Sequence, residues 1–199
     1  MTRYKKICFI LLMLVLFSIW GYYTWEINAM YPNPENIPVQ QGETFTYKGA
    51  SITATDMQVY QFDELMTAYP DLSNAYDIMG EEGYTQKESA KENNYFTATL
   101  NVENNSNEVV TFSKESILYW VIEIGVERNS ADFFYFQTLN PSYTSKLQPG
   151  EHEEVILCYG ILKDYLSFTD IKNSDIKLVY SYYPTKNYVL RKANDKHEN

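Results

Sequence analysis

Few residues of this chain are of the types that carry out acid–base, nucleophilic or metal chemistry. Its 199 residues include two histidines, His152 and His197, and two cysteines, Cys8 and Cys158. A zinc site needs several His or Cys ligands at set spacing, and covalent catalysis needs a nucleophile beside a base. Neither arrangement occurs around His152 or Cys158. We therefore expect an exposed His152 in a turn, a buried Cys158 thiol, and no catalytic residue, metal site or cofactor.

Carboxylates are more abundant, and several are close neighbours in the sequence. The groups are Asp63 with Glu64, Glu81 with Glu82, and Glu151 with Glu153 and Glu154. None follows the Asp-x-Asp-x-Asp-Gly spacing of an EF-hand loop, although a looser calcium site stays open. A pair of glycosidase carboxylates is defined by the distance between the two groups in the fold, so spacing does not identify one. Hydrolysis of a wall polymer is therefore the least favoured function.

Charge is distributed unevenly along the chain. Arg3, Lys5 and Lys6 precede the first apolar run, and no Asp or Glu occurs before Glu26. Residues 26–199 contain the other 13 of the 16 basic residues and all 26 acidic residues, which gives them a net charge of −13. Phosphate backbones would be repelled, so a nucleic acid is not an expected partner. Basic proteins and cationic peptides are better suited electrostatically, and the acidity also favours solubility.

An apolar segment near the N-terminus predicts a membrane helix. Residues 7–25 carry no charge, come close to the roughly 20 residues that cross a bilayer, and end in interfacial Trp and Tyr. The basic residues 1–6 should stay in the cytoplasm, which makes the chain a single-pass cell-membrane protein with an extracytoplasmic domain. The alternative is a cleaved signal peptide, with secretion after a cut near Ala29. Because Cys158 is the one cysteine beyond this segment, no disulfide is expected there, as is common on Gram-positive surfaces.

The rest of the chain predicts a β-rich domain. Residues 26–42 contain three prolines and predict an extended linker. Short alternating or apolar runs separated by turn signals then predict strands at 44–49, 50–62, 95–105, 109–112, 117–126, 131–140, 155–161, 175–184 and 187–191. This series is typical of an antiparallel, immunoglobulin-like β-sandwich over residues 43–192, with a polar tail at 193–199. A change of phase near Asp56 predicts a β-bulge.

Turn residues separate several of these runs. Residues 104–107, Asn-Asn-Ser-Asn, predict a tight reversal because Asn tolerates left-handed backbone and its side chain bonds to nearby amides. Pro149-Gly150 predicts a second turn, and Asn129-Ser130 a third.

Residues 63–93 interrupt the strand pattern. They lack alternation and are rich in polar residues, which predicts an insertion of short helices and loops. Asp63 is a candidate N-cap of a helix that Pro70 ends. Residues 85–88, TQKE, have the pattern of a capping box. We expect this insertion to carry the binding surface, if the protein has a specific one.

Aromatic side chains supply the other candidate contact residues. In a strand at 131–140, Phe134 and Phe136 would share one face and Phe133 and Tyr135 the other. One set would be core and the other an exposed aromatic face, which marks recognition sites. The candidate binding surface combines tyrosines of the insertion with aromatics of two strands: Tyr69, Tyr76, Tyr84, Phe134, Phe136, Tyr182 and Tyr183.

Two segments carry a family resemblance. The run "ATLNVENNSNEVVTF" (98–112) with "LQPGEHEEVILCYGI" (147–161) resembles small exported immunoglobulin-like, telokin-like proteins of Gram-positive bacteria, mostly domains of unknown function. The resemblance covers about residues 44–190 and leaves the 63–93 insertion without a counterpart. It implies an anchor, a linker and one sandwich, and it supplies no catalytic residues.

Three functions follow in order of preference. The first is a non-enzymatic, membrane-anchored module that binds another cell-envelope component, such as an envelope protein. The second is an immunity or resistance protein that sequesters a cationic peptide at the membrane. The third is the wall hydrolase.

Overall fold

The computed structural model describes residues 3–30, 35–47, 49–111, 120–144, 146–180 and 186–191. The chain forms two compact units, residues 1–35 and residues 36–199. In the first unit, helix α1 (Arg3–Met30) contains 27 residues, Tyr4–Met30, that are apolar and long enough to cross a membrane, with mean hydropathy 2.1. The expected anchor or signal helix is therefore present, and it extends beyond residues 7–25 at both ends.

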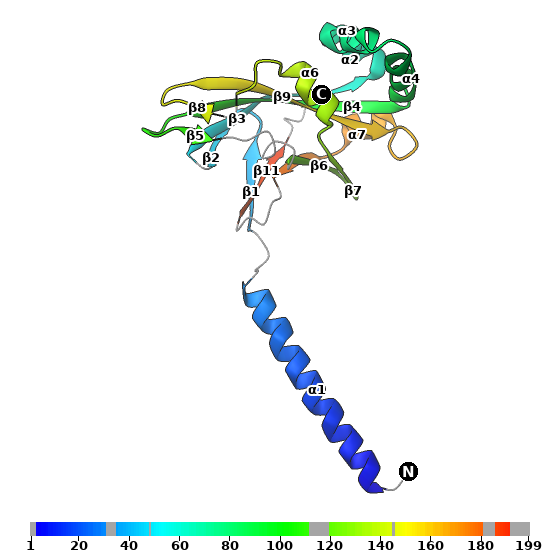
Figure 1. Ribbon diagram of the computed structural model, residues 1–199, viewed down its shortest axis with the longest axis vertical. Coiled ribbons are helices and arrows are strands. Elements are labelled where there is room, and N and C mark those ends of the chain that lie inside the picture. Colours follow the sequence, from blue (N-terminus) through cyan, green and yellow to red (C-terminus); the bar gives the residue numbers. More distant parts are fainter. Residues whose placement is uncertain are drawn as a thin grey trace, which may run out of the picture. The chain divides into compact units, whose positions relative to one another are not determined.

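Two antiparallel sheets and a set of short helices build the second unit (Figure 1). The five-stranded sheet has the order β1 (Glu35–Gln40), β11 (Lys186–Arg191), β10 (Ile176–Tyr180), β6 (Trp120–Ile124) and β7 (Glu127–Ser130). The four-stranded sheet has the order β2 (Thr44–Tyr47), β3 (Ala50–Gln61), β4 (Asn93–Asn104) and β9 (His152–Leu162). A small third sheet pairs β5 (Val110–Thr111) with β8 (Lys146–Leu147). Every pair whose register is defined by the described residues is antiparallel.

The main hydrophobic core lies between the two large sheets. Alternation along β4 explains this, because Phe96, Ala98, Leu100 and Val102 all point to the side of the five-stranded sheet and are at most 1% exposed. They share one cluster with Trp120 and other buried residues of that sheet. The register of β3 against β4 shifts between Ala54 and Asp56, which confirms the predicted bulge.

The polar segment at residues 104–107, at the end of β4, is built around one buried side chain, that of Asn104. The Asn104 amide donates to the carbonyls of Glu108 (2.7 Å) and Leu147 (2.8 Å) and accepts from the Ser106 amide (3.0 Å) and hydroxyl (2.7 Å). Its backbone carbonyl accepts from the Gly150 amide (2.8 Å). Asn104 therefore joins the bend at residues 106–108 to the Pro149-Gly150 turn, and the predicted Pro149-Gly150 turn is confirmed. The strand after the bend, β5, pairs with β8 and not with β4, so residues 104–107 do not close a hairpin between paired strands.

Among the described residues of this unit, five helices accompany the sheets, so the domain is mixed α/β and not mostly β as expected. They are α2 (Phe62–Ala68), α3 (Pro70–Ile78), α4 (Glu81–Ala90), α6 (Phe133–Leu139) and α7 (Phe168–Asn173). Helices α2–α4 form the predicted 63–93 insertion, and α2 and α6 pack on the face of the four-stranded sheet away from the main core (Figure 1). The N-cap of α2 is Gln61, whose amide donates to Glu64 at 2.8 Å, so the prediction of Asp63 is wrong. Residues 85–88 lie inside α4, so no capping box forms there.

Three further expectations are corrected. Most of the expected strand 131–140 is helix α6 (Phe133–Leu139), because Asp132 caps its N-terminus by accepting from the amides of Phe134 (2.8 Å) and Tyr135 (3.4 Å). Residues 129–130 belong to β7, and the preceding turn lies at Gly125, whose φ of 61° suits glycine. The expected linker 26–42 contains the end of α1 and the strand β1. The break between the expected strands 175–184 and 187–191 falls largely outside the described residues.

Candidate functional site

A chain of three buried tyrosine hydroxyls ties the helical layer to the four-stranded sheet. Tyr76 of α3 bonds to Tyr135 of α6 (2.8 Å between the hydroxyl oxygens), and Tyr135 bonds to Tyr95 of β4 (2.9 Å). Tyr95 donates its only hydroxyl proton to the carbonyl of Ala90 in α4 (2.8 Å). Tyr135 must therefore donate to Tyr95, and Tyr76 to Tyr135. One polar chain thus connects three helices to one strand.

Burial keeps these groups protonated. It raises the pKa of Tyr95 to about 12 and also raises the pKa values of Tyr76 and Tyr135. The Cys158 thiol belongs to the same hydrophobic cluster, is fully buried, and has a pKa raised by burial as well. The expectation of a buried Cys158 is confirmed, and a protonated, inaccessible thiol is not a nucleophile.

The segment from β7 to α6 covers the free edge of β9. The Asp132 amide donates to the Cys158 carbonyl (3.2 Å), and the Asn129 side chain donates to the Gly160 carbonyl. Asn140 both donates to the Ile156 carbonyl (2.8 Å) and accepts from its amide (2.7 Å). These contacts satisfy an edge that would otherwise be open to strand pairing, and they fix β7 and α6 beside α4.

A groove with a volume of about 710 Å³ lies between these elements. Its described lining comes from α3, α4, β4, β7, α6, β9 and the loop before α6: Tyr76, Gln86, Ser89, Ala90, Asn93, Asn129, Ser130, Ala131, Asp132, Phe133, Phe134, Tyr135, Gly160 and Leu162. Asp132 is the only acidic or basic residue in this described lining, and its carboxylate already caps α6. The groove therefore offers amides, hydroxyls and the half-exposed ring of Phe133 (49%).

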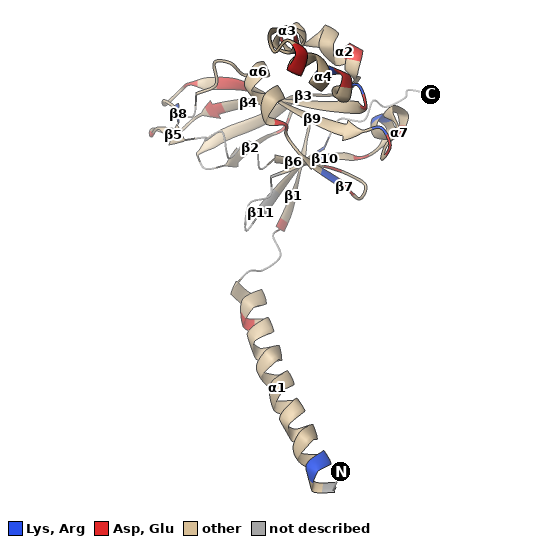
Figure 2. Cartoon of the chain, turned by 45° about the vertical axis from the view of Figure 1, so that its right-hand side comes forward, with Lys and Arg blue, Asp and Glu red and all other residues tan. Residues whose placement is uncertain are grey.

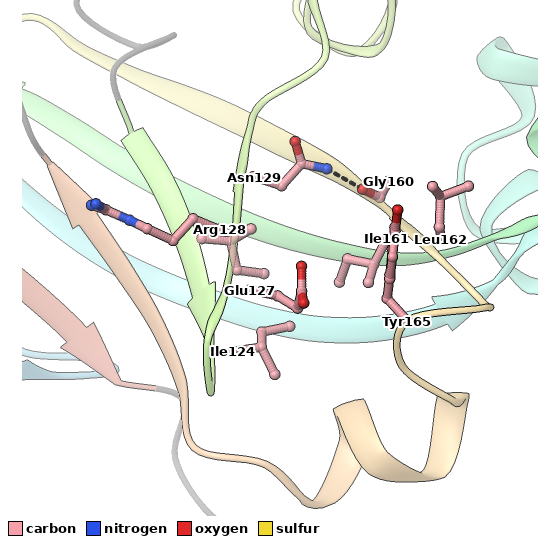
Figure 3. A pocket seen from close by; sticks show the side chains of 9 residues that line it. Ile124, Glu127, Arg128, Asn129, Gly160, Ile161, Leu162 and Tyr165 are labelled. Carbon is pink, nitrogen blue, oxygen red and sulfur yellow. Dashed lines mark hydrogen bonds between the residues drawn. The ribbon is translucent and has the colours of Figure 1, made fainter.

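A smaller pocket of about 230 Å³ adjoins the groove and shares Asn129, Gly160 and Leu162 with it. It opens where β7 and β9 lie next to each other, and Ile122, Ile124 and Ile161 supply apolar walls (Figure 3). Glu127, Arg128 and Tyr165 complete its lining.

The outer surface of the helical layer is acidic. Residues 62–90 carry seven acidic side chains against one lysine: Asp63, Glu64, Asp71, Asp77, Glu81, Glu82 and Glu88 against Lys87 (Figure 2). At the turn between α3 and α4, this surface also exposes Ile78 (86%) and Tyr84 (66%). An acidic surface with exposed apolar side chains complements a cationic amphipathic partner.

The structure divides the residues that the sequence suggested for a binding surface. Tyr84 is exposed, whereas Tyr69 and Phe134 are partly buried. Tyr76 (3% exposed) and Phe136 (1% exposed) are buried, so the prediction that they lie on an exposed aromatic surface is wrong, although Tyr76 also lines the groove. Both errors have one cause: the aromatic side chains anchor helices to the sheet, and they do not form an exposed sheet face. Tyr182 and Tyr183 lie outside the described residues.

The groove brings together residues that the sequence did not single out. Gln86, Ser89, Asn129, Ser130 and Phe133 come from three segments and meet only in the fold. The one local signal was Asp132, a good N-cap ahead of a run without strand-like alternation.

The histidines and carboxylates do not form a metal site within the described part of the chain. No group of three or more His, Cys, Asp or Glu side chains there could hold a metal ion. His152 is the exposed first residue of β9, directly after the turn, and His197 lies outside the described residues.

Comparison with known proteins identifies the family. Residues 29–187 match the family described as Domain of unknown function (DUF5028), and the chain belongs to it. No curated protein matches the sequence.

Several solved structures of Gram-positive proteins are similar to the chain. An uncharacterized beta-sandwich protein from Clostridium difficile 630 has 10% identity and a TM-score of 0.45, over 80% of this chain and 95% of that one. A functionally unknown protein from Listeria monocytogenes EGD-e has 10% identity and a TM-score of 0.43, over 69% and 71%. A conserved hypothetical protein from Bacillus anthracis has 12% identity and a TM-score of 0.43, over 69% and 86%.

Proposed function

We propose that this protein is a single-pass membrane protein whose extracytoplasmic domain binds a polypeptide segment of another cell-envelope component. In this proposal α1 is an uncleaved anchor with a cytoplasmic N-terminus, and the domain is an immunoglobulin-like sandwich to which the helices add a binding groove. The protein acts by binding and not by catalysis. Cleavage near Ala29 would release the same domain and leave its groove intact.

The lining of the groove is the observation that supports this proposal. Neutral amides and hydroxyls, such as those of Gln86, Ser89 and Asn129, are suited to the carbonyl and amide groups of a peptide backbone. The partly exposed ring of Phe133 offers the aromatic contact that interface centres favour. Charged groups, which interface centres lack, are nearly absent from the described lining.

A pair of substitutions with matched exposure tests the groove. Phe133 is 49% exposed inside the groove, and Val109 is 48% exposed outside the described lining. With the full-length protein crosslinked in cells, Phe133→Ser should reduce recovery of the main envelope partner severalfold, whereas Val109→Ser should leave it unchanged. Equal recovery with both variants would contradict binding in the groove, and a glycan in place of a protein adduct would contradict the polypeptide partner.

The acidic helical surface favours a second candidate function, the sequestration of a cationic antimicrobial peptide. Seven acidic side chains and the exposed Ile78 and Tyr84 are suited to a basic amphipathic helix. Deletion of the protein should then sensitise cells to such a peptide, and added salt should weaken the capture because the acidic groups are exposed. Unchanged sensitivity across a panel of cationic peptides would remove this function.

A further inference from the structure

The pocket beside the groove has an unusual combination of walls and charge. Strand β7 pairs with β6, so Glu127 lies opposite Ile124 and Asn129 opposite Ile122. Because side chains alternate along a strand, Glu127 and Asn129 point to the same side as these two buried isoleucines. The inner side of the sheet, which is apolar along β6, therefore ends at β7 in a carboxylate and an amide.

The Glu127 carboxylate is available for a ligand. Asn129 is already engaged, since its amide donates to the Gly160 carbonyl and accepts from the Ser130 amide at 2.9 Å. The half-buried Glu127 side chain has no hydrogen-bond or ion-pair partner among the described residues. Figure 3 shows its carboxylate within the pocket, near Ile161 and Tyr165.

The nearby cations are held elsewhere. Arg128 follows Glu127 and also lines the pocket, but its guanidinium bonds to Glu123 at 2.9 Å. The Lys163 ammonium, on the chain segment after β9, donates to the Lys91 carbonyl. Neither cation pairs with Glu127 within the described structure, so the pocket keeps one unpaired carboxylate in its lining.

We infer that this pocket binds an alkylammonium group, that of a lysine side chain in the polypeptide that occupies the groove. The aliphatic stem of a lysine matches the walls formed by Ile124, Ile161 and Leu162, and its compact ammonium matches the single carboxylate of Glu127. At about 230 Å³ the pocket is smaller than the about 300–1,000 Å³ of sites for drug-sized ligands, and it suits one side chain. The pocket and the groove share the lining residues Asn129, Gly160 and Leu162, so a polypeptide bound in the groove reaches the pocket with one of its side chains.

The inference rests on the proposed function for the identity of the ligand, but the pocket is testable by itself. The probe is Nα-acetyl-lysine N-methylamide, titrated against the full-length protein in lipid nanodiscs by ligand-detected NMR. Its comparison ligand is Nα-acetyl-norleucine N-methylamide, which keeps the aliphatic stem and lacks the ammonium. We expect the lysine probe to bind about tenfold more tightly than the norleucine probe, as a charge-assisted hydrogen bond is lost with the ammonium.

Two isosteric variants separate the pocket from the general acidity of the domain. Glu127→Gln should weaken binding of the lysine probe about tenfold, whereas Glu154→Gln, which removes an exposed carboxylate of β9 outside the pocket, should not change it. Equal affinity of Glu127→Gln and the wild type, equal affinity for both probes, or no binding of the lysine probe would each overturn the inference. The crosslink to the envelope partner depends on Phe133 and should form without Glu127. If Glu127→Gln keeps both this crosslink and the wild-type affinity for the lysine probe, the lysine pocket is refuted and binding in the groove is not.

Discussion

Replacing Tyr135 by Phe should destabilise the domain more than replacing Tyr76, the end member of the tyrosine chain, by Phe. Tyr135 is the middle member: it accepts from Tyr76 and donates to Tyr95, with oxygen–oxygen distances of 2.8 and 2.9 Å. The substitution keeps the ring and removes both bonds. It leaves the buried Tyr76 hydroxyl without its acceptor, so we expect a loss of about 2–3 kcal/mol in unfolding free energy.

The neighbouring tyrosines provide graded controls for this substitution. Tyr76→Phe removes one bond and leaves Tyr135 able to donate to Tyr95, which should cost about 1 kcal/mol. Tyr84→Phe changes an exposed side chain and should cost close to nothing. Urea unfolding of residues 35–199, followed by near-ultraviolet circular dichroism, measures all three. A Tyr135→Phe variant as stable as Tyr84→Phe would refute the hydroxyl chain as a stabilising element.

Three further predictions concern the same architecture. Burial raises the pKa of Tyr95 to about 12, so the Tyr95 hydroxyl ionises more readily in the unfolded chain and the unfolding free energy should fall as pH rises above about 10. Folded protein in which every tyrosine ionises with a pKa near 10 would contradict this prediction. Gly83→Ala should destabilise the domain by about 3 kcal/mol, because a Cβ there would lie 2.0 Å from the backbone oxygen of Tyr76. A thermal unfolding midpoint equal to that of the wild type would contradict this close packing of α4 on α3. Asn104→Ala should lower the unfolding free energy by about 3 kcal/mol and Asn105→Ala by less than about 1 kcal/mol, because the Asn104 side chain makes four hydrogen bonds and that of the exposed Asn105 makes one, to Ser51. Equal urea midpoints for the two variants would contradict the role of Asn104.

Sequence reasoning predicted the parts of the fold in which local pattern and tertiary packing agree. The hydropathy of residues 7–25 predicted α1, and the alternation of residues 95–105 predicted which side chains of β4 enter the core. The bulge near Asp56 was readable because a change of phase in a half-buried strand has no other simple cause.

The errors arose where tertiary context decides. Aromatic residues favour strands, which led to a strand at 131–140, but the capping carboxylate of Asp132 starts helix α6 there. Strand β7, Glu-Arg-Asn-Ser, has a weak strand propensity and forms because β6 pairs with it. The prolines of residues 26–42 predict a linker, but β1, which contains Pro38, lies at the edge of a sheet, where proline is tolerated.

The groove was less predictable than the fold. The 63–93 insertion was a sound indication of where the added structure lies, and α4 does contribute Gln86 and Ser89 to the groove. The other side of the groove comes from residues 129–135 and 160–162, which are distant from α4 in the sequence. No local sequence spacing predicts that these segments lie beside α4, because their position depends on how the β7–α6 segment covers the edge of β9.

The central claim is that the groove binds a segment of an envelope polypeptide, and site-specific photo-crosslinking in cells tests it most directly. A photoreactive residue in place of Ser89 lies in the groove, whereas one in place of Thr46 lies on an exposed position of β2 outside the described lining. We expect one dominant protein adduct from position 89 and none of that mass from position 46. Adducts of the same kind from both positions, or none from position 89, would contradict it.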